Sequence, residues 1–208
     1  MPAANTEWTQ STKFEGRLMN NLNPTRHSTI LRREETALLI IDIQEKIFKV
    51  MLNSETLISN AIKLIQGFHI LNLPIYVTEQ YPKGLGETES RIKAALNNLE
   101  PIQKMSFSCA GAGDLFDILK RRSIKQVVVA GIESHVCVQQ TALDLLENGF
   151  QVNLAADACS SRKEIDYNIA LDRMRSSGII VTTTEAILFE LLNVCGTDEF
   201  KSISKIIK

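Results

Sequence analysis

A buried strand that turns directly into a helix, at residues 127–150, is the feature that most constrains how this chain folds. Its first four residues, VVVA, form the near-continuous apolar run typical of a strand inside a parallel sheet. Gly131 then allows a sharp turn, and Ser134 is a candidate N-cap for a helix with apolar residues at three- and four-residue spacing. Cys137 therefore falls in the first helical turn, where free backbone N–H groups and the helix dipole favour a thiolate. This position suits a nucleophile.

Similar strand and helix patterns alternate along the rest of the chain. Apolar runs predict further strands at 37–44, 73–80, 102–106, 151–161 and within 178–186. Helical periodicity indicates helices at 54–71, 91–99, 114–121, 163–176, 187–194 and 198–208. Alternation of this kind is typical of βαβ units with right-handed crossovers. The sequence therefore predicts a three-layer, Rossmann-like α/β fold, with a six-stranded, mainly parallel sheet and helices on both faces.

The character of the chain changes near residue 33. Residues 1–33 are rich in Asn, Thr and Ser and lack periodicity, so we expect a partly ordered arm, followed by one domain at 34–208. The arm is expected to lie on the surface of the domain or on a neighbouring subunit. Its recurring arginines and few acidic residues leave a targeting presequence as the alternative interpretation.

Composition argues against several classes of function. The net charge of −1 gives no electrostatic reason to expect a nucleic acid or an anionic membrane as a partner. No apolar run approaches the ~20 residues that are needed to cross a bilayer. The four cysteines show no CxxC or zinc-ligand spacing, so free thiols in a reducing compartment are expected. These features predict a cytoplasmic protein.

Three chemically distinct side chains stand where predicted strands end. Asp42 follows the first strand, Lys104 lies in the third, and Cys137 follows the fourth. Ligands of parallel sheets bind outside the carboxyl ends of the strands, so we expect the three side chains to share a site. Taken singly, each has an ordinary explanation, as a loop cap, a solvated lysine and a structural cysteine. Together they supply the base, the cation and the thiol that acyl transfer through a cysteine requires.

Four segments resemble the isochorismatase-like cysteine hydrolases, the superfamily that includes nicotinamidases and N-carbamoylsarcosine amidases. The segments are ALLIIDIQEKIF, KMSFSC, VVVAGIESHVCVQQTALDLLENGFQV and DACSSR, within roughly residues 35–195. The sequences TEQYPKGLGET and DACSSR look most like the isochorismatase domain-containing branch of that superfamily.

The resemblance assigns roles to individual residues. It implies a catalytic triad of Asp42, Lys104 and Cys137. It also implies a non-proline cis peptide between Ile132 and Glu133, with the N–H groups of Glu133 and Cys137 aimed at the substrate oxygen. The side chains expected to line the substrate pocket are Gln44, Phe48, Gln80, Tyr81 and Ser134. Nicotinamidases hold a metal with histidines near the second strand, but TEQYPKG contains none, so neither a metal nor another cofactor is expected.

The resulting hypothesis is a metal-free cysteine hydrolase of a small amide, imide or ureido substrate. Cys137 would attack the carbonyl, Asp42 would shuttle the proton to the leaving amine, and water would cleave the thioester. True isochorismatases, which cleave a vinyl ether, lack the nucleophilic cysteine, so that reaction is not expected. The resemblance also implies a homo-oligomer, from dimer to octamer.

Two other classes of protein compete with the hydrolase hypothesis. A non-catalytic binding or scaffold protein would keep the fold and use its arm or surface for partners. A dinucleotide-binding Rossmann enzyme has only Ala-Gly-Ala-Gly at 110–113 in its favour, and the third glycine of that fingerprint is missing.

Overall fold

The computed structural model describes residues 25–208 and contains a six-stranded sheet in the order β3-β2-β1-β4-β5-β6. Every neighbouring pair of strands is parallel, so the sheet is parallel throughout rather than mainly parallel. The strands are β1 (Thr36–Ile41), β2 (Ile75–Gln80), β3 (Ile102–Lys104), β4 (Gln126–Ile132), β5 (Gln151–Ser160) and β6 (Ile180–Thr182). The predicted α/β fold class is confirmed.

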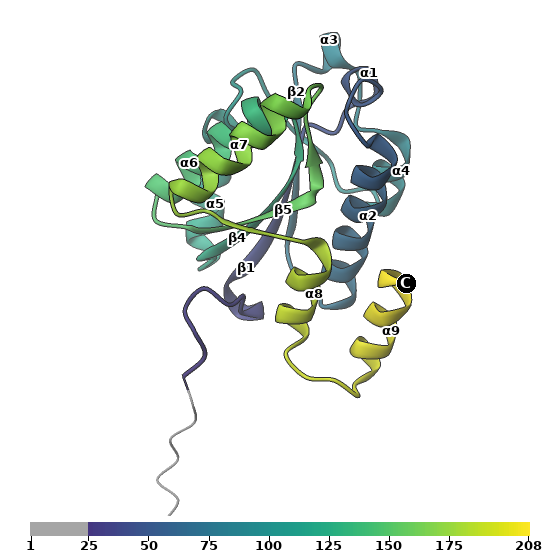
Figure 1. Cartoon of the computed structure of the whole chain (residues 1–208), viewed down its shortest axis with the longest axis vertical. Helices are drawn as coiled ribbons and strands as arrows, with labels where there is room; N and C mark the ends of the chain where they lie inside the picture. Colours follow the sequence, from purple (N-terminus) through teal and green to yellow (C-terminus); the bar gives the residue numbers. More distant parts are fainter. Residues whose placement is uncertain (1–24) are drawn as a thin grey trace, which may run out of the picture.

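Helices cover both faces of the sheet, as Figure 1 shows. One layer holds α2 (Ser54–Ile70), α4 (Ser90–Ala95), α8 (Thr184–Leu192) and α9 (Asp198–Ile207). The other layer holds α5 (Leu115–Arg121), α6 (Gln139–Glu147) and α7 (Glu164–Ser176). Successive residues of β1 alternate between the two cores, with Leu38 and Ile40 in the first and Leu39 and Ile41 in the second. Each fully buried aliphatic side chain of this kind stabilises the fold by about 1.5–3 kcal/mol.

Short helical segments near the ends of strands were not expected from the sequence. They are η1 (Arg33–Glu35), α1 (Glu45–Phe48), α3 (Pro82–Leu85) and η2 (Cys109–Gly111). The π-helix η3 (Ser134–Val138) stands where the sequence predicts the first turn of a regular helix. Segments of three to five residues are too short to show a helical period, so only local features such as Pro82 at the start of α3 could indicate them.

Helix α8 begins earlier than the sequence predicts. Helix α8 starts at Thr184, before the predicted start of 187, because two oxygens satisfy its first N–H groups. The Asp157 carboxylate accepts hydrogen bonds from the Thr184 N–H (2.8 Å) and hydroxyl (3.0 Å). The Thr183 hydroxyl accepts from the N–H of Ala186. Asp157, which lies at the bulged part of β5, therefore has a structural role.

Gly131 brings the two central strands into unusually close approach. It pairs with Ile41 and has a φ of +142°, a value that side-chain-bearing residues rarely adopt. A Cβ at this position would lie 2.1 Å from the carbonyl oxygen of Ile41. Glycine is therefore required where β1 and β4 deliver Asp42 and Cys137.

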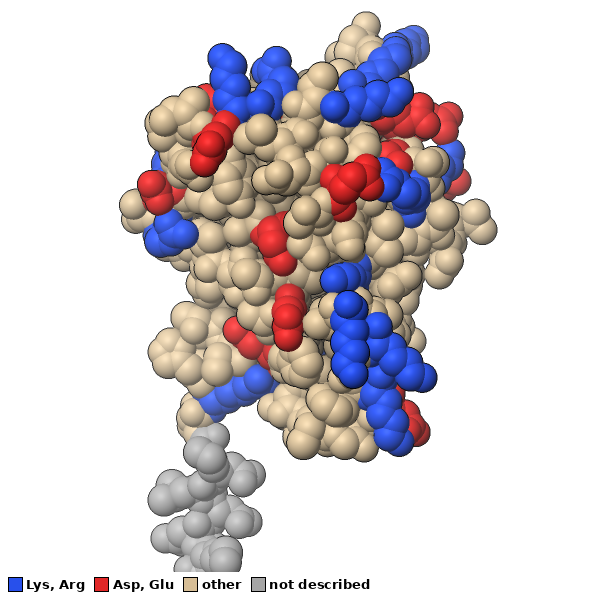
Figure 2. Space-filling view, turned by 45° about the vertical axis from the view of Figure 1, so that its right-hand side comes forward, with Lys and Arg blue, Asp and Glu red and all other residues tan. Residues whose placement is uncertain are grey.

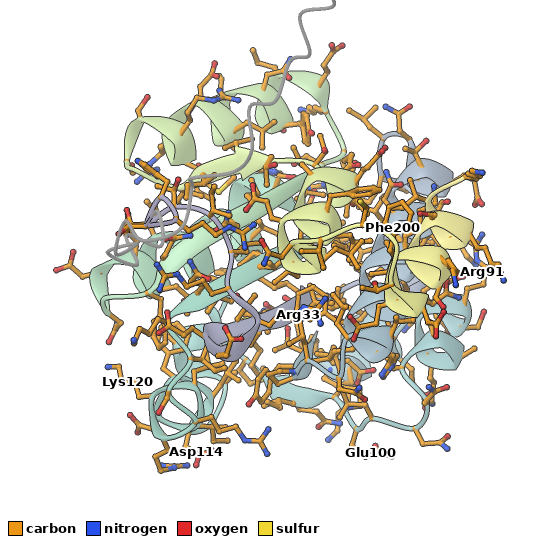
Figure 3. The ribbon with its side chains drawn as sticks, turned by 90° about the horizontal axis from the view of Figure 1, so that it is seen from below. Arg33, Arg91, Glu100, Asp114, Lys120 and Phe200 are labelled. Carbon is orange, nitrogen blue, oxygen red and sulfur yellow. The ribbon has the colours of Figure 1, made fainter. Side chains whose placement is uncertain are left out.

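Residues 25–33, the described part of the predicted arm, pack against the end of the sheet where the strands begin. Leu31 is fully buried in the first core, and the Arg26 guanidinium donates to the carbonyl of Glu190 (2.9 Å). Arg33 donates to the carbonyl of Leu191 (2.6 Å) and forms an ion pair with Glu199 (2.8 Å). Figure 3, seen from this end, shows Arg33 close to the last two helices. The rest of the predicted arm, residues 1–24, lies outside the described residues.

The surface carries both signs of charge. On the face drawn in Figure 2, acidic side chains are interspersed with basic ones, which gather mainly at the upper and lower ends. None of the helices within residues 25–208 is both long enough and apolar enough to traverse a lipid bilayer.

Candidate active site

The strand order brings Asp42, Lys104 and Cys137 to one place. Asp42 follows the central strand β1, Lys104 ends β3, and Cys137 lies in η3, just after β4. Strand β2 lies between β3 and β1 in the sheet, and two of its side chains contact the pair: Thr78 contacts Asp42, and Gln80 contacts Lys104. The Thr78 hydroxyl donates to Asp42 Oδ1 (2.8 Å), a contact that no sequence pattern indicated.

The Lys104 ammonium group is buried and surrounded by oxygens. Its Nζ lies 2.7 Å from Asp42 Oδ2 and 3.0 Å from Gln80 Oε1. It also donates to the carbonyls of Ser106 (3.1 Å) and Phe107 (2.8 Å), because the chain curls around the amine after β3 ends. An ammonium group has three N–H donors, so these four oxygens occupy all of them. Lys104 thus balances the negative charge of the Asp42 carboxylate and fixes its orientation.

The Cys137 side chain is buried beside this ion pair. Its thiol donates to Gln80 Oε1 at 3.4 Å, so one amide oxygen accepts from both the cysteine and the lysine. Burial raises the pKa of the Cys137 thiol well above its usual range, the negative charge of Asp42 raises this pKa further, and Lys104 lowers it. Burial thus opposes the thiolate that the helix start is expected to favour.

The turn before Cys137 differs from a regular helix start. The peptide bond between Ile132 and Glu133 is cis, at the position that the resemblance implied. The carbonyl of Glu133 accepts hydrogen bonds from the N–H groups of Val136 (3.0 Å) and Val138 (3.2 Å), and the second of these is the i→i−5 bond of a π-turn. Ser134 Oγ is buried and has no hydrogen-bond partner among the described residues, so Ser134 is not the predicted N-cap.

A cavity of about 260 Å³ opens onto the acid and the thiol. Its polar lining residues include Gln80 and Glu133. Arg162 Nε donates to Oε1 of Glu133 at 2.8 Å. The rest of the cavity wall is mainly apolar, and the lining residues are Asp42, Ile47, Gln80, Tyr81, Leu85, Phe107, Ile132, Glu133, Val136 and Cys137. Asp42 and Tyr81 both have left-handed backbone conformations, with φ of +52° and +39°. Strain of this kind is common where a functional site fixes side-chain direction.

Only two of the five residues that were expected to line the substrate pocket do so in the structure. Gln80 and Tyr81 line the cavity, but Gln44, Phe48 and Ser134 are not part of its wall. Gln44 is fully buried and holds the end of β2, accepting from the Gln80 N–H (2.8 Å) and donating to the Gln80 carbonyl (3.0 Å). Phe48 belongs to the first core, and the Arg91 guanidinium lies 5.6 Å from the centre of its ring.

Four apolar lining residues were missed by the sequence reasoning. They come from α1, α3, the loop after β3, and η3, and they are Ile47, Leu85, Phe107 and Val136. Short helices and a loop position these residues, and such segments are too short to show a periodic pattern in the sequence. The only available signal in the sequence was an aromatic residue directly after the predicted third strand at 102–106. This residue, Phe107, is 54% exposed in the structure.

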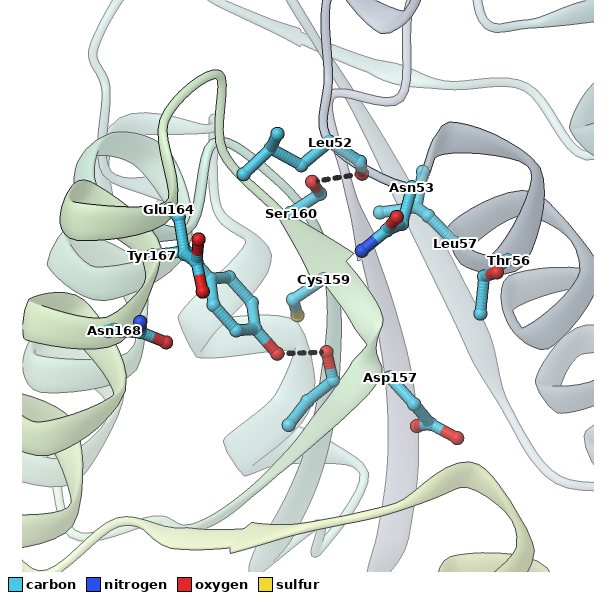
Figure 4. Close-up of a pocket in the computed structure, with 11 residues that line it drawn as sticks. Leu52, Asn53, Thr56, Leu57, Asp157, Cys159, Ser160, Glu164, Tyr167 and Asn168 are labelled. Carbon is cyan, nitrogen blue, oxygen red and sulfur yellow. Dashed lines mark hydrogen bonds between the residues drawn. The ribbon is translucent and has the colours of Figure 1, made fainter.

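A second cavity, of about 400 Å³, lies between the start of α2, the bulged part of β5 and α7. Figure 4 shows Cys159 in its wall, with the Tyr167 hydroxyl donating to the carbonyl of Ala156 (2.9 Å) and Ser160 Oγ to that of Leu52 (2.6 Å). The two cavities share no lining residue. Because the Asp-Lys-Cys cluster lies at the smaller cavity, the smaller one is the candidate active site. Within residues 25–208, no three His, Cys, Asp or Glu residues are grouped so that they could hold a metal ion.

Comparison with known proteins identifies relatives of the whole domain. The isochorismatase domain matches residues 36–186. Isochorismatase domain-containing protein 2 of Danio rerio is 39% identical over 177 residues, which cover 85% of this chain and 89% of the relative. The structure of MAR1 ribonuclease from Caenorhabditis elegans is 38% identical, with a TM-score of 0.80 over 85% of this chain and 91% of that one.

A more distant structure shares the fold. The YcaC gene product of Escherichia coli, described as an octameric hydrolase of unknown specificity, is 23% identical, with a TM-score of 0.80 over 88% of this chain and 92% of that one. The resemblance recognised in the sequence is confirmed by the domain match and by the relatives at more than a third identity. The chain belongs to the isochorismatase domain family.

Proposed function

We propose that this protein is a cysteine hydrolase that cleaves a small amide, imide or ureido substrate through a thioester on Cys137. Membership of the isochorismatase domain family supports hydrolase chemistry in general. The observation that carries the finer proposal is the position of the Cys137 thiol, which meets the Asp42–Lys104 ion pair at the wall of a single small cavity.

The raised pKa of Cys137 determines the order of the proposed steps. In the free protein the thiol keeps its proton, so attack on the carbonyl carbon is coupled to transfer of that proton to the Asp42 carboxylate. The carbonyl oxygen becomes an oxyanion, for which we propose the N–H groups of Glu133 and Cys137 as donors. Collapse of the intermediate expels the amine, which takes the proton from Asp42. Water then attacks the thioester, giving its proton to Asp42, and the released thiol recovers it.

Lys104 has a supporting role in this mechanism. Its amine donates to four oxygens and is not hydrogen-bonded to Cys137, so it acts on the thiol through its charge and through Asp42. The family relationship leads us to propose a homo-oligomer, and the E. coli neighbour is described as an octamer.

Phosphodiester cleavage is the alternative reaction, because the C. elegans neighbour is named a ribonuclease. Amide hydrolysis is better supported in this chain. The cavity is small and mainly apolar, and the one lysine near its catalytic groups has every N–H engaged. A phosphate would have to give up its water without gaining a free cation in return.

A screen of small amides with matched cysteine variants tests the proposal. We expect wild-type protein to release ammonia or amine from at least one substrate, and Cys137→Ala to lower kcat by at least ~10³-fold. Cys109→Ala is the control, since Cys109 is a fully buried thiol near Asp42 that does not line the cavity. It should retain turnover.

Mass spectrometry of acid-quenched wild-type protein should show an acyl adduct on Cys137. Unchanged turnover in the Cys137→Ala variant would remove the proposed mechanism. Cys137-dependent cleavage of RNA in the same panel, without hydrolysis of any amide, would favour phosphodiester chemistry. Folded protein with no activity of either kind would favour the binding or scaffold alternative.

A further inference from the structure

We propose that this cavity selects neutral, apolar carboxamides and rejects carboxylates, and that Glu133, held in place by Arg162, makes that distinction. The inference rests on the proposed function, because it concerns the cavity in which Cys137 would react. It goes further by assigning a specificity role to a side chain outside the Asp-Lys-Cys cluster.

Glu133 is placed to accept a hydrogen bond from a substrate. Glu133 is one of the residues that line the cavity beside Cys137, and its side chain is only 8% exposed. Arg162 Nε contacts Oε1 at 2.8 Å, whereas Oε2 accepts no hydrogen bond from any residue within 25–208. This oxygen therefore keeps lone pairs to which an N–H group of a bound molecule can donate. A primary amide carries such N–H groups next to its reactive carbonyl.

The charges around the cavity disfavour an anionic substrate. Asp42 and Glu133 both line it, and no lysine or arginine within residues 25–208 does. Lys104 pairs with Asp42, and the Lys104 side chain is fully buried. Arg162 pairs with Glu133, and 58% of the Arg162 side chain is exposed to solvent. Both cations are therefore already paired. A substrate carboxylate would lose its hydration next to two negative groups and find no free cation.

Size and wall chemistry define the rest of the substrate. The cavity volume of about 260 Å³ lies just below the ~300–1,000 Å³ that is usual for ligand pockets, so the cavity suits a small molecule. Tyr81, Leu85, Phe107 and Val136 provide an apolar surface opposite the polar groups. The substrate class is thus a primary amide with a short aliphatic or single-ring acyl group.

A pair of nearly isosteric alkylating agents measures this selectivity without turnover. Iodoacetamide is a neutral primary amide, and iodoacetate is its anionic counterpart. The exposed Cys195 of the same chain is an internal reference for their intrinsic difference in reactivity. We expect the rate ratio of iodoacetamide to iodoacetate at pH 8 to be at least tenfold higher at Cys137 than at Cys195. Equal ratios at the two cysteines would overturn the proposal.

Substitution of Glu133 tests which residue causes the preference. Glu133→Gln removes the charge and should bring the ratio at Cys137 to within about threefold of that at Cys195. Glu164→Gln is the matched control, because Glu164 lines the second cavity, and it should keep the wild-type ratio. Cys109 is fully buried and lines neither cavity, so its failure to react shows that each variant is folded. A wild-type ratio in folded Glu133→Gln protein would contradict the role of Glu133.

A matched substrate pair links the inference to catalysis. Pentanamide should be hydrolysed at least tenfold faster, in kcat/KM, than glutaramate, which adds a carboxylate to a similar acyl chain. Glu133→Gln should narrow that difference. If neither amide nor any other is cleaved, the proposed function fails while the alkylation ratios still decide the selectivity. Faster hydrolysis of glutaramate would refute the selectivity and leave the hydrolase function intact.

Discussion

Gln80 shows how much of this site depends on a side chain that carries no charge. Its Oε1 accepts from both Lys104 Nζ (3.0 Å) and Cys137 Sγ (3.4 Å), while its Nε2 donates to the carbonyl of Met105 (3.1 Å). The last bond fixes which way the amide faces, so the oxygen is always directed at the thiol and the amine. Gln80 was expected to bind substrate, and the structure gives it contacts that position the catalytic groups.

Replacing Gln80 with leucine should therefore affect chemistry more than substrate binding. Gln80→Leu keeps a similar volume but removes the oxygen that the thiol and the lysine share. We expect kcat to fall by at least about tenfold with a smaller change in KM, and the free energy of unfolding to fall by about 1–3 kcal/mol because buried donors lose their acceptor. Steady-state kinetics and urea denaturation measure the two effects.

Gln103→Leu, an exposed position on β3, is the control and should change neither quantity much. Unaltered kcat in Gln80→Leu would show that Lys104 and Cys137 keep their positions without this amide.

For single residues, the sequence was sufficient to predict which side chains form the site but not their protonation or their hydrogen-bond partners. Asp42, Lys104 and Cys137 could be chosen because each stands at a strand end, and the structure brings them together. The protonation of Cys137 could not be foreseen, because it depends on how deeply the sulfur is buried. The carbonyls around Lys104 come from a loop that no side-chain pattern describes.

Among the secondary-structure elements, η3 departs most from the sequence prediction. A regular helix beginning at Ser134 was expected, and the structure instead has a π-turn over Ser134–Val138 before α6. Apolar spacing cannot separate the two, because one extra residue in the first turn leaves the later spacing unchanged. The extra residue directs Cys137 into the cavity. π-Turns of this kind are frequent at functional sites.

The unpartnered Ser134 hydroxyl provides a stability test of this element. Ser134→Ala should change the free energy of unfolding by less than about 0.5 kcal/mol, because no hydrogen bond is lost. Thr197→Ala is the comparison, since the Thr197 hydroxyl accepts from the N–H of Phe200 (3.0 Å) at the start of α9. Loss of that cap should cost about 1 kcal/mol. Urea denaturation measures the free energy of unfolding of both variants. An equal loss in the two would mean that Ser134 does cap its helix.

Across the molecule, three of the four cysteines are buried and only Cys195 is exposed. Burial raises the pKa of Cys109 to about 11, with a further contribution from the charge of Asp42, and raises the pKa of Cys159 to about 12. The unfolded chain has ordinary thiols with pKa values near 8.5. The folded state therefore binds more protons than the unfolded state at alkaline pH. Stability is fully present below about pH 8.5 and falls as the pH rises toward the folded values.

Removing one buried thiol should weaken this pH dependence. Between pH 8 and pH 10, we expect Cys109→Ala to lose less stability than wild type, by about 1–2 kcal/mol, since a single titrating group contributes about 1.4 kcal/mol per pH unit. Urea denaturation at both pH values gives the difference. Cys195→Ala is the control and should show the wild-type pH dependence. Identical losses in Cys109→Ala and wild type would show that the buried thiol does not contribute.

The overall architecture was largely predictable, and the reasons are physical. Buried parallel strands and amphipathic helices have distinct periods, so their alternation determined the fold class and the edge of the sheet that holds the site. The packing of residues 25–33 was not predictable, because it depends on arginine contacts to carbonyls at the end of α8. The cavity walls likewise come from short loop helices whose direction is set only in the folded chain.

The location of Cys195 has a practical consequence. It lies in the loop between α8 and α9, at the end of the molecule away from α1 and α3, whose residues form part of the cavity wall (Figure 1). A linker too bulky for the cavity would attach only to this surface-exposed sulfur and would anchor every copy in the same orientation, with the opening turned toward the liquid. The protein thus carries a built-in handle for sensor chips and single-molecule optics that leaves the candidate site unobstructed.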